Sequence, residues 1–499
     1  MVFLLIVILI ITILYFKISN SHRYWLQRGV NQNDPTFLFG DTTKAFFRYE
    51  STYSTLQRLY NSFPDERYIG IYEMTKPILL IRDPELIHQI YFEAFDYFAD
   101  RRDAMPEADD TVWTKNLAAL TGEEWSKTKR FLSSCFNTKN LEETFTLIAE
   151  CAELYVDHLK KRRPMKLELK DTFIRFSNDV IASIAFGVSQ MDSINFRDNE
   201  FYQMSKSLST FTFKQNLVGL AYCICPSLCK KLGLSVLNTE TINYFKDVLD
   251  ENLAERRALN EGGRRRRQDI LSFLEEEQRQ SRDESVDIAA QAFTFFYFGF
   301  DTVSTSLVFL VYELSINTKI QAKLHKEIDE TLKMNLGKIS YNDLMKMIYL
   351  DQVVSEGLRK WPPCVGGDRV CTKPYIIQPS KRTECRIELN PGDLVGISIA
   401  GIQNDPKYFP RPNAFIPERF SEENKIKIQP NTYLPFGVGP RSCVGAKIAL
   451  LQIKIFIFHL LAKFHLTPCS KERINVSANC YDLKADGRVW IMLRTRKKN

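Results

Sequence analysis

Apolar residues are concentrated in a few long stretches of the chain, and the first of them is the N-terminal run MVFLLIVILIITILYF. As a helix this run would be about 24 Å long, close to the ~30 Å hydrocarbon core of a bilayer. The basic residues that follow, Lys17, Arg23 and Arg28, favour a cytoplasmic position for the rest of the chain. We therefore expect a retained membrane signal anchor over residues 1–18. A cleaved signal peptide is the alternative, for which only the weak small-residue site SNS at 19–21 is available.

After the anchor the pattern changes from strand-like to helix-like. Alternating apolar residues over Arg67–Ile87 predict a hairpin that turns into a helix at Asp83–Pro84. The longest helical pattern covers roughly Asp287–Leu314. Because this segment is apolar throughout, it predicts a helix that runs through the core rather than over the surface.

Helices and short strands alternate over the C-terminal part of the chain. The segment DLMKMIYLDQVVSEGLRKW predicts a helix that ends at Pro362–Pro363, because a proline disfavours helical backbone at the residue before it. The stretch RIELNPGDLVGIS predicts short strands, and a further helix is expected from Cys443 to about Lys463. Many helices with a small sheet at one side predict a mainly α, α+β fold.

Composition and charge further limit the domain organisation and the possible functions. The chain is 44% hydrophobic with 35 phenylalanines and has no internal repeat, so we expect one large domain over 37–499, joined to the anchor by a linker over 19–36. The 11 cysteines are odd in number and scattered, which indicates a reducing compartment and mostly free, buried thiols. The net charge is +7, and the basic run Arg264–Arg267 is interpreted as a solvated loop, since no nucleic-acid-binding motif accompanies it.

A second apolar stretch with basic residues, Phe213–Leu237, has two interpretations. It could dip into the bilayer surface as a monotopic contact, or it could be an ordinary buried helix and loop. The pattern does not decide between them.

The segment PFGVGPRSCVGAK at 435–447 is a glycine-rich bend that presents one cysteine. Gly437 and Gly439 have no Cβ, so backbone N–H groups can come close to whatever lies at the bend. Gly445 has no side chain, which leaves space at the start of the helix that follows. The bend therefore predicts that Cys443 holds a bulky, flat partner through its sulfur.

The long apolar helix contains a polar pair in the sequence FFYFGFDTVSTS. Asp301 and Thr302 place a carboxylate and a hydroxyl in apolar surroundings, where polar groups need partners or a role. One hypothesis is a groove at Gly299 in which this pair delivers protons to a bound group. The alternative is that the Thr302 hydroxyl bonds the carbonyl four residues earlier and merely bends the helix.

A third motif, SEGLRKWPP, places Glu356 and Arg359 three residues apart on one helical face, where they can pair. Arg419 in the segment FIPERF could complete a buried three-way network with them. Removing one partner of a buried ion pair is strongly destabilising, so we expect these residues to be structural rather than catalytic.

These motifs, in this order, resemble the cytochrome P-450 family of haem-thiolate monooxygenases over the whole chain. The segments FGFDTVSTS, LRKWPP and TYLPFGVGPRSC are similar to insect microsomal members that metabolise foreign compounds. The resemblance implies the family fold, with a long central helix over the haem and a small β-rich region at the side. It also implies haem b, with Cys443 as the thiolate ligand of the iron, Phe436 shielding the sulfur, and Gly445 beside the cofactor.

The resemblance further implies partners for the haem propionates, namely Arg441, Arg369 and Trp125. The family pattern places an arginine four residues after this tryptophan, but here that residue is Lys129, and Arg130 lies one position further. One residue turns a helix by about 100°, so Arg130 faces elsewhere. We prefer Lys129 over Arg130 as the propionate partner and leave both open.

The implied reaction is the activation of O₂ with two electrons from NADPH and the insertion of one oxygen atom into a lipophilic substrate. Asp301 and Thr302 would manage proton delivery. Electrons would come from the membrane-bound NADPH–cytochrome P-450 reductase, with cytochrome b5 as a second candidate donor. Because the flavin domain of the reductase is acidic, Lys127, Lys139 and Lys447 are candidates for its docking face. The implied location is the endoplasmic reticulum membrane, with the catalytic domain on the cytoplasmic side.

The chain departs from the family pattern at Phe298, where relatives have alanine or glycine. Either its ring turns away from the haem, or it forms a wall of the substrate site, for which Val365 and the segment Asp103–Ala119 are further candidates. The hinge after the anchor is also reduced to Pro35, with Phe37 at a common proline position.

Two other functions remain open on the sequence alone. A haem-thiolate isomerase or dehydratase would not use O₂, and it commonly lacks the acid–alcohol pair that this chain has at Asp301 and Thr302. A non-catalytic haem-binding or ligand-binding membrane protein is the second alternative.

Overall fold

The computed structural model describes residues 2–102, 112–161, 165–188, 199–209, 213–224, 226–236, 238–261, 268–470 and 472–496. The basic run Arg264–Arg267 and the first part of the expected pocket segment, 103–111, lie outside these residues. The chain forms two compact units, each assembled from segments that are far apart in the sequence. The first unit holds residues 1–102, 355–443 and 474–487, and the second holds 103–354, 444–473 and 488–499.

The first unit contains the four-stranded and the two-stranded sheet and several short helices. Its helices are α1 (Val2–Ser21), α2 (Thr43–Phe46), α3 (Thr52–Asn61), α4 (Pro84–His88), α17 (Ile399–Ile402) and α18 (Glu422–Lys425). Its strands are β1 (Tyr68–Glu73), β2 (Lys76–Ile81), β4 (Gly366–Val370), β5 (Tyr375–Ile377), β6 (Ile387–Leu389) and β7 (Leu394–Ser398). Strands β1, β2, β7 and β4 form one sheet in this order, and β5 pairs with β6.

The predicted hairpin is confirmed as the antiparallel pair β1–β2. Strand β7 then joins β2 in parallel and β4 in antiparallel orientation. The predicted start of a helix at Asp83–Pro84 is also confirmed, because the Asp83 carboxylate accepts a hydrogen bond from the Glu85 N–H at 3.0 Å and caps α4.

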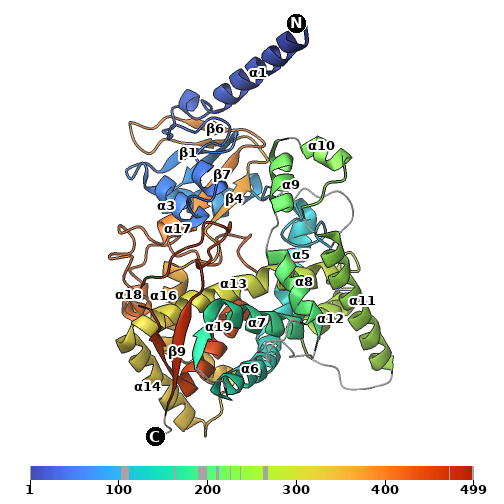
Figure 1. Cartoon of the computed structure of the whole chain (residues 1–499), viewed down its shortest axis with the longest axis vertical. Helices are drawn as coiled ribbons and strands as arrows, with labels where there is room; N and C mark the ends of the chain where they lie inside the picture. The colour runs from blue at the N-terminus through green and yellow to red at the C-terminus, as the bar shows by residue number, and fades with distance from the viewer. Residues whose placement is uncertain are drawn as a thin grey trace. The chain divides into compact units, whose positions relative to one another are not determined.

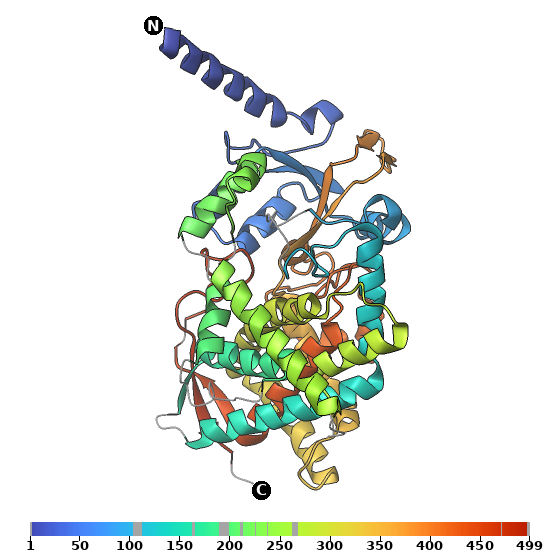
Figure 2. The same cartoon turned by 90° about the vertical axis from the view of Figure 1, so that its right-hand side faces the viewer.

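The second unit is mainly helical. Its helices are α5 (Gly122–Cys135), α6 (Thr138–Lys161), α7 (Leu169–Ile181), α8 (Glu200–Ser209), α9 (Phe213–Ile224), α10 (Pro226–Lys231), α11 (Thr239–Glu261), α12 (Ile270–Ser281), α13 (Ile288–Ile316), α14 (Thr318–Met334), α15 (Tyr341–Met345) and α19 (Ala446–Lys463). Helix α16 (Ile348–Lys360) begins in this unit and ends in the first. An antiparallel sheet has the order β3 (Lys166–Glu168), β9 (Trp490–Thr495) and β8 (Phe464–Pro468), the last two drawn in red in Figure 1 and Figure 2.

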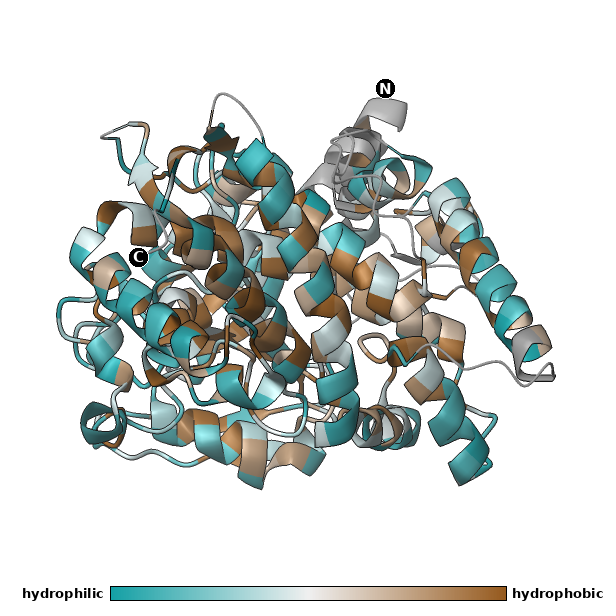
Figure 3. Ribbon diagram, turned by 90° about the horizontal axis from the view of Figure 1, so that it is seen from below, coloured by the Kyte–Doolittle hydropathy of each residue, from teal (hydrophilic) through white to brown (hydrophobic). Residues whose placement is uncertain are grey.

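The predicted long apolar helix is confirmed as α13, shown in yellow in Figure 1. Asp287 caps its N-terminus by accepting from the Ala290 N–H at 3.0 Å. The helix packs against α7 and α19, and most of its side chains are buried. Its length and composition would also suit a membrane span, but this degree of burial is typical of the core helix of a folded domain. Most other helices carry both hydrophilic and hydrophobic bands, as the colours of Figure 3 show.

The single helix expected over residues 343–361 is instead two helices, α15 and α16. Ser340 and Asp343 form a capping box that starts α15. The Glu327 carboxylate from α14 accepts hydrogen bonds from the N–H groups of Tyr349 and Leu350, at 2.7 and 2.8 Å, and so caps α16 separately. A contact between distant segments therefore interrupts a helix that the local pattern would continue.

The cysteines follow the sequence prediction only in part. Those that the structure describes are free thiols, but only Cys135, Cys151, Cys229 and Cys371 are buried. Cys364, Cys385, Cys443 and Cys469 are exposed and Cys480 is half-buried, so among the described cysteines fewer than half are buried.

The apolar stretch Phe213–Leu237 forms helices α9 and α10. Tyr222 and Cys229 are buried, whereas Leu217, Leu228 and Leu232 are exposed. The described part of this stretch is therefore amphipathic, and it offers apolar side chains to its surroundings.

Candidate cofactor site

The glycine-rich bend is present and presents an exposed Cys443 thiol. The Cys443 N–H donates to the Phe436 carbonyl at 2.9 Å, which closes the loop at its base. Gly437 and Gly439 both have φ of +74°, a left-handed conformation that favours glycine. A Cβ on Gly439 would also lie 2.2 Å from the carbonyl oxygen of Tyr91, so the bend could not close with another residue there. Gly445 is the N-cap residue of α19.

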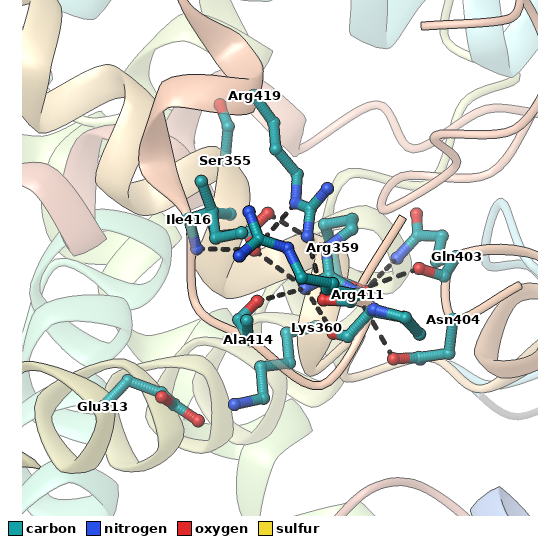
Figure 4. Close-up of polar contacts among 12 residues, drawn as sticks. Glu313, Ser355, Arg359, Lys360, Gln403, Asn404, Arg411, Ala414, Ile416 and Arg419 are labelled. Carbon is teal, nitrogen blue, oxygen red and sulfur yellow. Dashed lines mark hydrogen bonds and ion pairs between the residues drawn. The ribbon is translucent and has the colours of Figure 1, made fainter. Parts of the chain in front are cut away.

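The structure brings Glu356, Arg359 and Arg419 together in the first unit (Figure 4). Arg359 donates two hydrogen bonds to the Glu356 carboxylate, at 2.9 and 2.8 Å, and both side chains are fully buried. Arg419 lies 3.4 Å from the same carboxylate, which also accepts from the Ile416 N–H at 2.9 Å. This arrangement is a bidentate ion pair with its remaining groups hydrogen-bonded.

The same network is connected to the cysteine loop. Arg359 donates to the carbonyl of Gln403 at 3.1 Å, and the Gln403 side chain donates to the carbonyls of Leu358 and Arg359. The Gln403 side-chain oxygen accepts from the Leu434 N–H at 2.6 Å, and the Leu434 carbonyl accepts from Gly437 at 3.0 Å. The buried ion pair therefore fixes the segment that leads into the bend around Cys443.

A group of arginines also lies in the first unit. Arg441 donates to the Ala99 carbonyl at 2.8 Å and pairs with Asp100 at 3.2 Å. Arg101 donates to the Arg441 carbonyl at 3.2 Å, and Arg369 lies over the Tyr91 ring. Arg101 was missed by the sequence reasoning, because the only indication in the sequence is the pair Arg101–Arg102, which resembles any exposed basic pair.

These arginines carry more positive charge than their surroundings neutralise. Burial is the main cause, and the charge of Arg101 a further one, that lowers the pKa of Arg441 to about 9 and that of Arg369 to about 10. The Nε of Arg369 is buried without a hydrogen-bond partner. A bound group with two carboxylates would supply the missing negative charge and acceptors, so the residues present fit the propionates of haem.

Cys364 lies near this group. It is exposed, yet the surrounding protein raises the pKa of its thiol to about 12, with burial as the main cause and Asp482 as the second. Val365, the pocket residue expected from the sequence, is only 5% exposed. Cys364 therefore exposes more of its side chain than Val365 does.

Helix α5 in the second unit carries the expected Trp125 and Lys129. Trp125 is buried, Lys129 is half-buried one helical turn later, and Arg130 is exposed. Lys129 is thus on the side of the helix that Trp125 occupies, in agreement with the preference for it over Arg130.

The polar pair of α13 is arranged differently from the groove expected at Gly299. The Thr302 hydroxyl donates to the Phe298 carbonyl at 2.7 Å, which is the local bond of the alternative interpretation. A Cβ on Gly299 would lie 3.0 Å from the Cδ1 of Ile181 in α7. The glycine therefore allows close packing of α13 against α7, and the groove at Gly299 stays a prediction.

Phe298 lies on a face of α13 that is not packed in the core. Its side chain is 41% exposed, and its ring centroid lies 5.0 Å from that of Tyr297 and 6.2 Å from that of Trp113. Trp113 itself is buried and contacts Tyr297 edge-to-face at 5.1 Å. This placement favours the pocket-wall hypothesis over packing between helices.

An exposed cysteine in a closed glycine bend, with buried arginines in the same unit, is the arrangement expected of a haem-thiolate protein. The family model for cytochrome P-450 matches residues 45–480, and the chain belongs to this family. It is therefore an oxidoreductase, a monooxygenase whose family implies a haem-thiolate cofactor.

Several insect proteins are similar along nearly their whole length. The chain is 34% identical to cytochrome P-450 9e2 of Blattella germanica, with 98% of this chain and 96% of the relative covered. It is 33% identical to the probable cytochrome P-450 9f2 of Drosophila melanogaster, with 96% of each covered. Identity to cytochrome P-450 6k1 of Blattella germanica is 30%, over 93% of this chain and 91% of the relative.

We expect Phe298→Ala to widen the range of ligand sizes that the protein accepts. Removal of the ring from a pocket wall leaves space for bulkier ligands. Small apolar ligands lose their contacts with the ring, which weakens their binding free energy by a few kcal/mol at most. The measurement is a titration with ligands of increasing size, with the spin-state spectrum of the haem as readout.

Phe295→Ala is the matched control, because this residue of the same helix is buried against Phe136 at a ring distance of 5.1 Å. It should lower the melting temperature and leave the size profile unchanged. If Phe298→Ala behaved in the same way, the ring would be a packing residue and not a pocket wall.

Proposed function

We propose that this protein is a membrane-anchored monooxygenase that uses NADPH-derived electrons and O₂ to insert one oxygen atom into lipophilic substrates, either foreign compounds or endogenous lipid-like ones. The observation that carries the proposal is the exposed Cys443 thiol at the closed bend. The arginine excess in the same unit supports it, since it suits the propionates of haem.

When bound, haem supplies the activation of O₂, which no protein side chain provides. The chain would hold it through the Cys443 thiolate, with Phe436 as a cover for the sulfur. Arg441, Arg369 and Arg101 would bind the propionates, and Trp125 and Lys129 are the candidates from α5.

Thr302 and Asp301 are proposed to manage protons. Since the Thr302 hydroxyl already donates to the Phe298 carbonyl, its oxygen is left to accept a hydrogen bond from a bound proton donor. Asp301, the preceding residue of the helix, is half-buried, so part of its side chain contacts solvent.

Basic residues of the second unit support docking of an acidic electron donor. The Lys447 ammonium donates to the Phe136 carbonyl at 3.3 Å, between α5 and α6, and Lys139 is exposed in the first turn of α6. Lys127 is paired with Asp283 at 3.0 Å, so it offers less free charge. The proposed donor is the NADPH–cytochrome P-450 reductase, with cytochrome b5 as an alternative.

Helix α1 is proposed as the membrane anchor, with the anchor proper at 1–18, the linker at 19–36 and the catalytic domain at 37–499. Figure 2 shows α1 as one continuous helix in dark blue. The described apolar side chains Leu5, Leu9, Ile13 and Phe16 are all exposed. An apolar helix with exposed side chains suits a lipid environment, here the endoplasmic reticulum membrane.

The test is reconstitution of the full chain with the reductase in lipid vesicles, with NADPH and a panel of lipophilic compounds. We expect O₂ uptake and NADPH oxidation that depend on both proteins, together with oxygenated product. Turnover of a hydroperoxide without NADPH would indicate an isomerase or dehydratase instead. Ligand binding without any turnover would indicate a binding protein.

We expect Thr302→Ala to lower product formed per NADPH and to raise hydrogen peroxide, because reduced oxygen leaves when a proton donor is no longer held in place. Thr302→Ser, which keeps the hydroxyl, should restore the yield. Thr294→Ala is the matched control, since that hydroxyl makes the same type of bond, to the Ala290 carbonyl at 2.8 Å in the same helix. Equal yields in both alanine variants would show that the Thr302 hydroxyl only bonds its helix.

A further inference from the structure

One buried side chain, that of Gln291, joins helix α13 to the segment that precedes α5. The Gln291 side-chain N–H donates to the Lys115 carbonyl at 2.8 Å, and its side-chain oxygen accepts from the Leu117 N–H at 3.1 Å. A buried amide is costly unless it is hydrogen-bonded, and here both ends of the amide are used. The segment around residues 115–117 is therefore fixed against α13 at two backbone groups.

These two bonds also determine the position of Trp113. The Asn116 N–H donates to the Trp113 carbonyl at 3.3 Å. The Asn116 side chain is fully buried, and its oxygen accepts from the N–H groups of Ala118 and Ala119, at 2.8 and 3.1 Å. Because its own hydrogen bonds close this turn, the bonds from Gln291 hold the whole turn, and Trp113 with it, against the helix.

Trp113 meets two aromatic residues of α13, and we call Trp113, Tyr297 and Phe298 the aromatic wall. The Tyr297 ring lies between those of Trp113, at 5.1 Å and edge-to-face, and Phe293, at 6.0 Å and nearly parallel. The Phe298 ring lies 5.0 Å from Tyr297 and 6.2 Å from Trp113. Trp113 is buried whereas Phe298 is exposed. Two neighbouring rings thus support a third ring that is open to a ligand.

The open ring lies on the same face of α13 as Thr302. The two residues are four positions apart, and the Thr302 hydroxyl donates to the Phe298 carbonyl at 2.7 Å. One helical turn, about 5 Å, therefore separates the aromatic wall from the hydroxyl proposed to manage protons. Aromatic rings prefer offset-stacked or edge-to-face contacts with other rings, so a fixed ring here favours a ligand that is itself aromatic.

We propose that Gln291 is a positioning residue for substrate recognition. It holds Trp113 against Tyr297 and Phe298, and the ring of Phe298 supported in this way selects planar aromatic substrates over saturated ones of similar size. When Gln291 loses its hydrogen bonds, the turn moves and Phe298 is no longer held. This inference names the substrate class within the proposed function and rests on it, and the test separates the two.

The test compares naphthalene with decahydronaphthalene, which share a fused two-ring carbon framework but of which only the first is planar and aromatic. Both are titrated on the same haem-loaded sample, with the spin-state spectrum as readout, and the ratio of the two dissociation constants is the aromatic preference. Comparing this ratio between variants cancels the different transfer of the two ligands from water. Gln291→Met and Phe298→Leu should each lower the preference about three- to tenfold, the size expected for one aromatic pair.

Gln321→Met is the matched control for Gln291→Met. Gln321 is also buried, and it joins α14 to β8 in the same way. It donates to the carbonyls of Leu314 and Leu466, at 2.8 and 3.0 Å, and accepts from the Leu466 N–H at 3.0 Å. Both methionine variants should lower the melting temperature, but only Gln291→Met should change the aromatic preference. An equal preference in the two variants would overturn the positioning role.

A double variant tests whether Gln291 acts through Trp113. Gln291→Met should cause no further change of preference in a Trp113→Leu background, and a further change would overturn the inference. If Gln291→Met does not load haem, Gln291→Glu takes its place, since it keeps an acceptor for the Leu117 N–H, and full retention of the preference would overturn the role.

The remaining outcomes separate this inference from the proposed function. NADPH-dependent oxygenation of both ligands, with a preference that Phe298→Leu leaves unchanged, would overturn only the aromatic substrate class. Absence of NADPH-dependent product from these ligands and from the whole panel of lipophilic compounds would overturn the proposed function itself.

Discussion

Glu356→Ala is expected to abolish the accumulation of folded, haem-loaded protein. The substitution leaves the Arg359 guanidinium fully buried without its bidentate partner, at a cost of about 3–5 kcal/mol. It also removes the acceptor of the Ile416 N–H and the partner of Arg419. A typical domain is stable by only ~5–15 kcal/mol, so this loss is a large fraction of the total. The bend at Cys443 would lose its support through Gln403 and Leu434 at the same time.

The measurement is the haem content and the melting temperature of purified protein. Glu276→Ala is a matched control, because Glu276 and Arg279 form a glutamate–arginine pair with the same spacing of three residues but are 51% and 60% exposed. An exposed pair contributes ~0–1 kcal/mol, so this variant should load haem normally. Normal haem content in Glu356→Ala, together with slower turnover, would assign Glu356 a catalytic role instead of a structural one.

Cys443→His is expected to eliminate the long-wavelength absorption band that reduced haem-thiolate proteins show with carbon monoxide. An anionic sulfur donates more electron density to iron than an imidazole does, and the band reports this donation. Turnover of lipophilic substrates should be lost with it.

Cys364→Ser is the sharpest control for this variant. Cys364 is also exposed, and it lies close enough to Cys443 for their charges to interact. The Cys364→Ser variant should retain the band. Burial raises the pKa of the Cys364 thiol, which keeps it protonated at neutral pH, whereas a metal ligand must be a thiolate. If Cys364→Ser lost the band and Cys443→His kept it, the ligand would have to be reassigned.

Local sequence patterns determined the features whose causes are themselves local. The continuous apolar character of roughly Asp287–Leu314 predicted α13 (Ile288–Ile316) to within two residues at its C-terminal end. Gly437 and Gly439 indicated the bend before Cys443, because a left-handed backbone strongly prefers glycine. The spacing of Glu356 and Arg359 placed them on one helical face, where they pair.

Only the tertiary structure decided which distant segments meet. Glu327 divides one expected helix into α15 and α16, and Ile181 packs against the position of Gly299. Arg101 joins Arg441 and Arg369 from a position far away in the sequence. These contacts depend on burial and charge contributed by remote residues, which the local pattern of hydrophobic and polar positions does not encode.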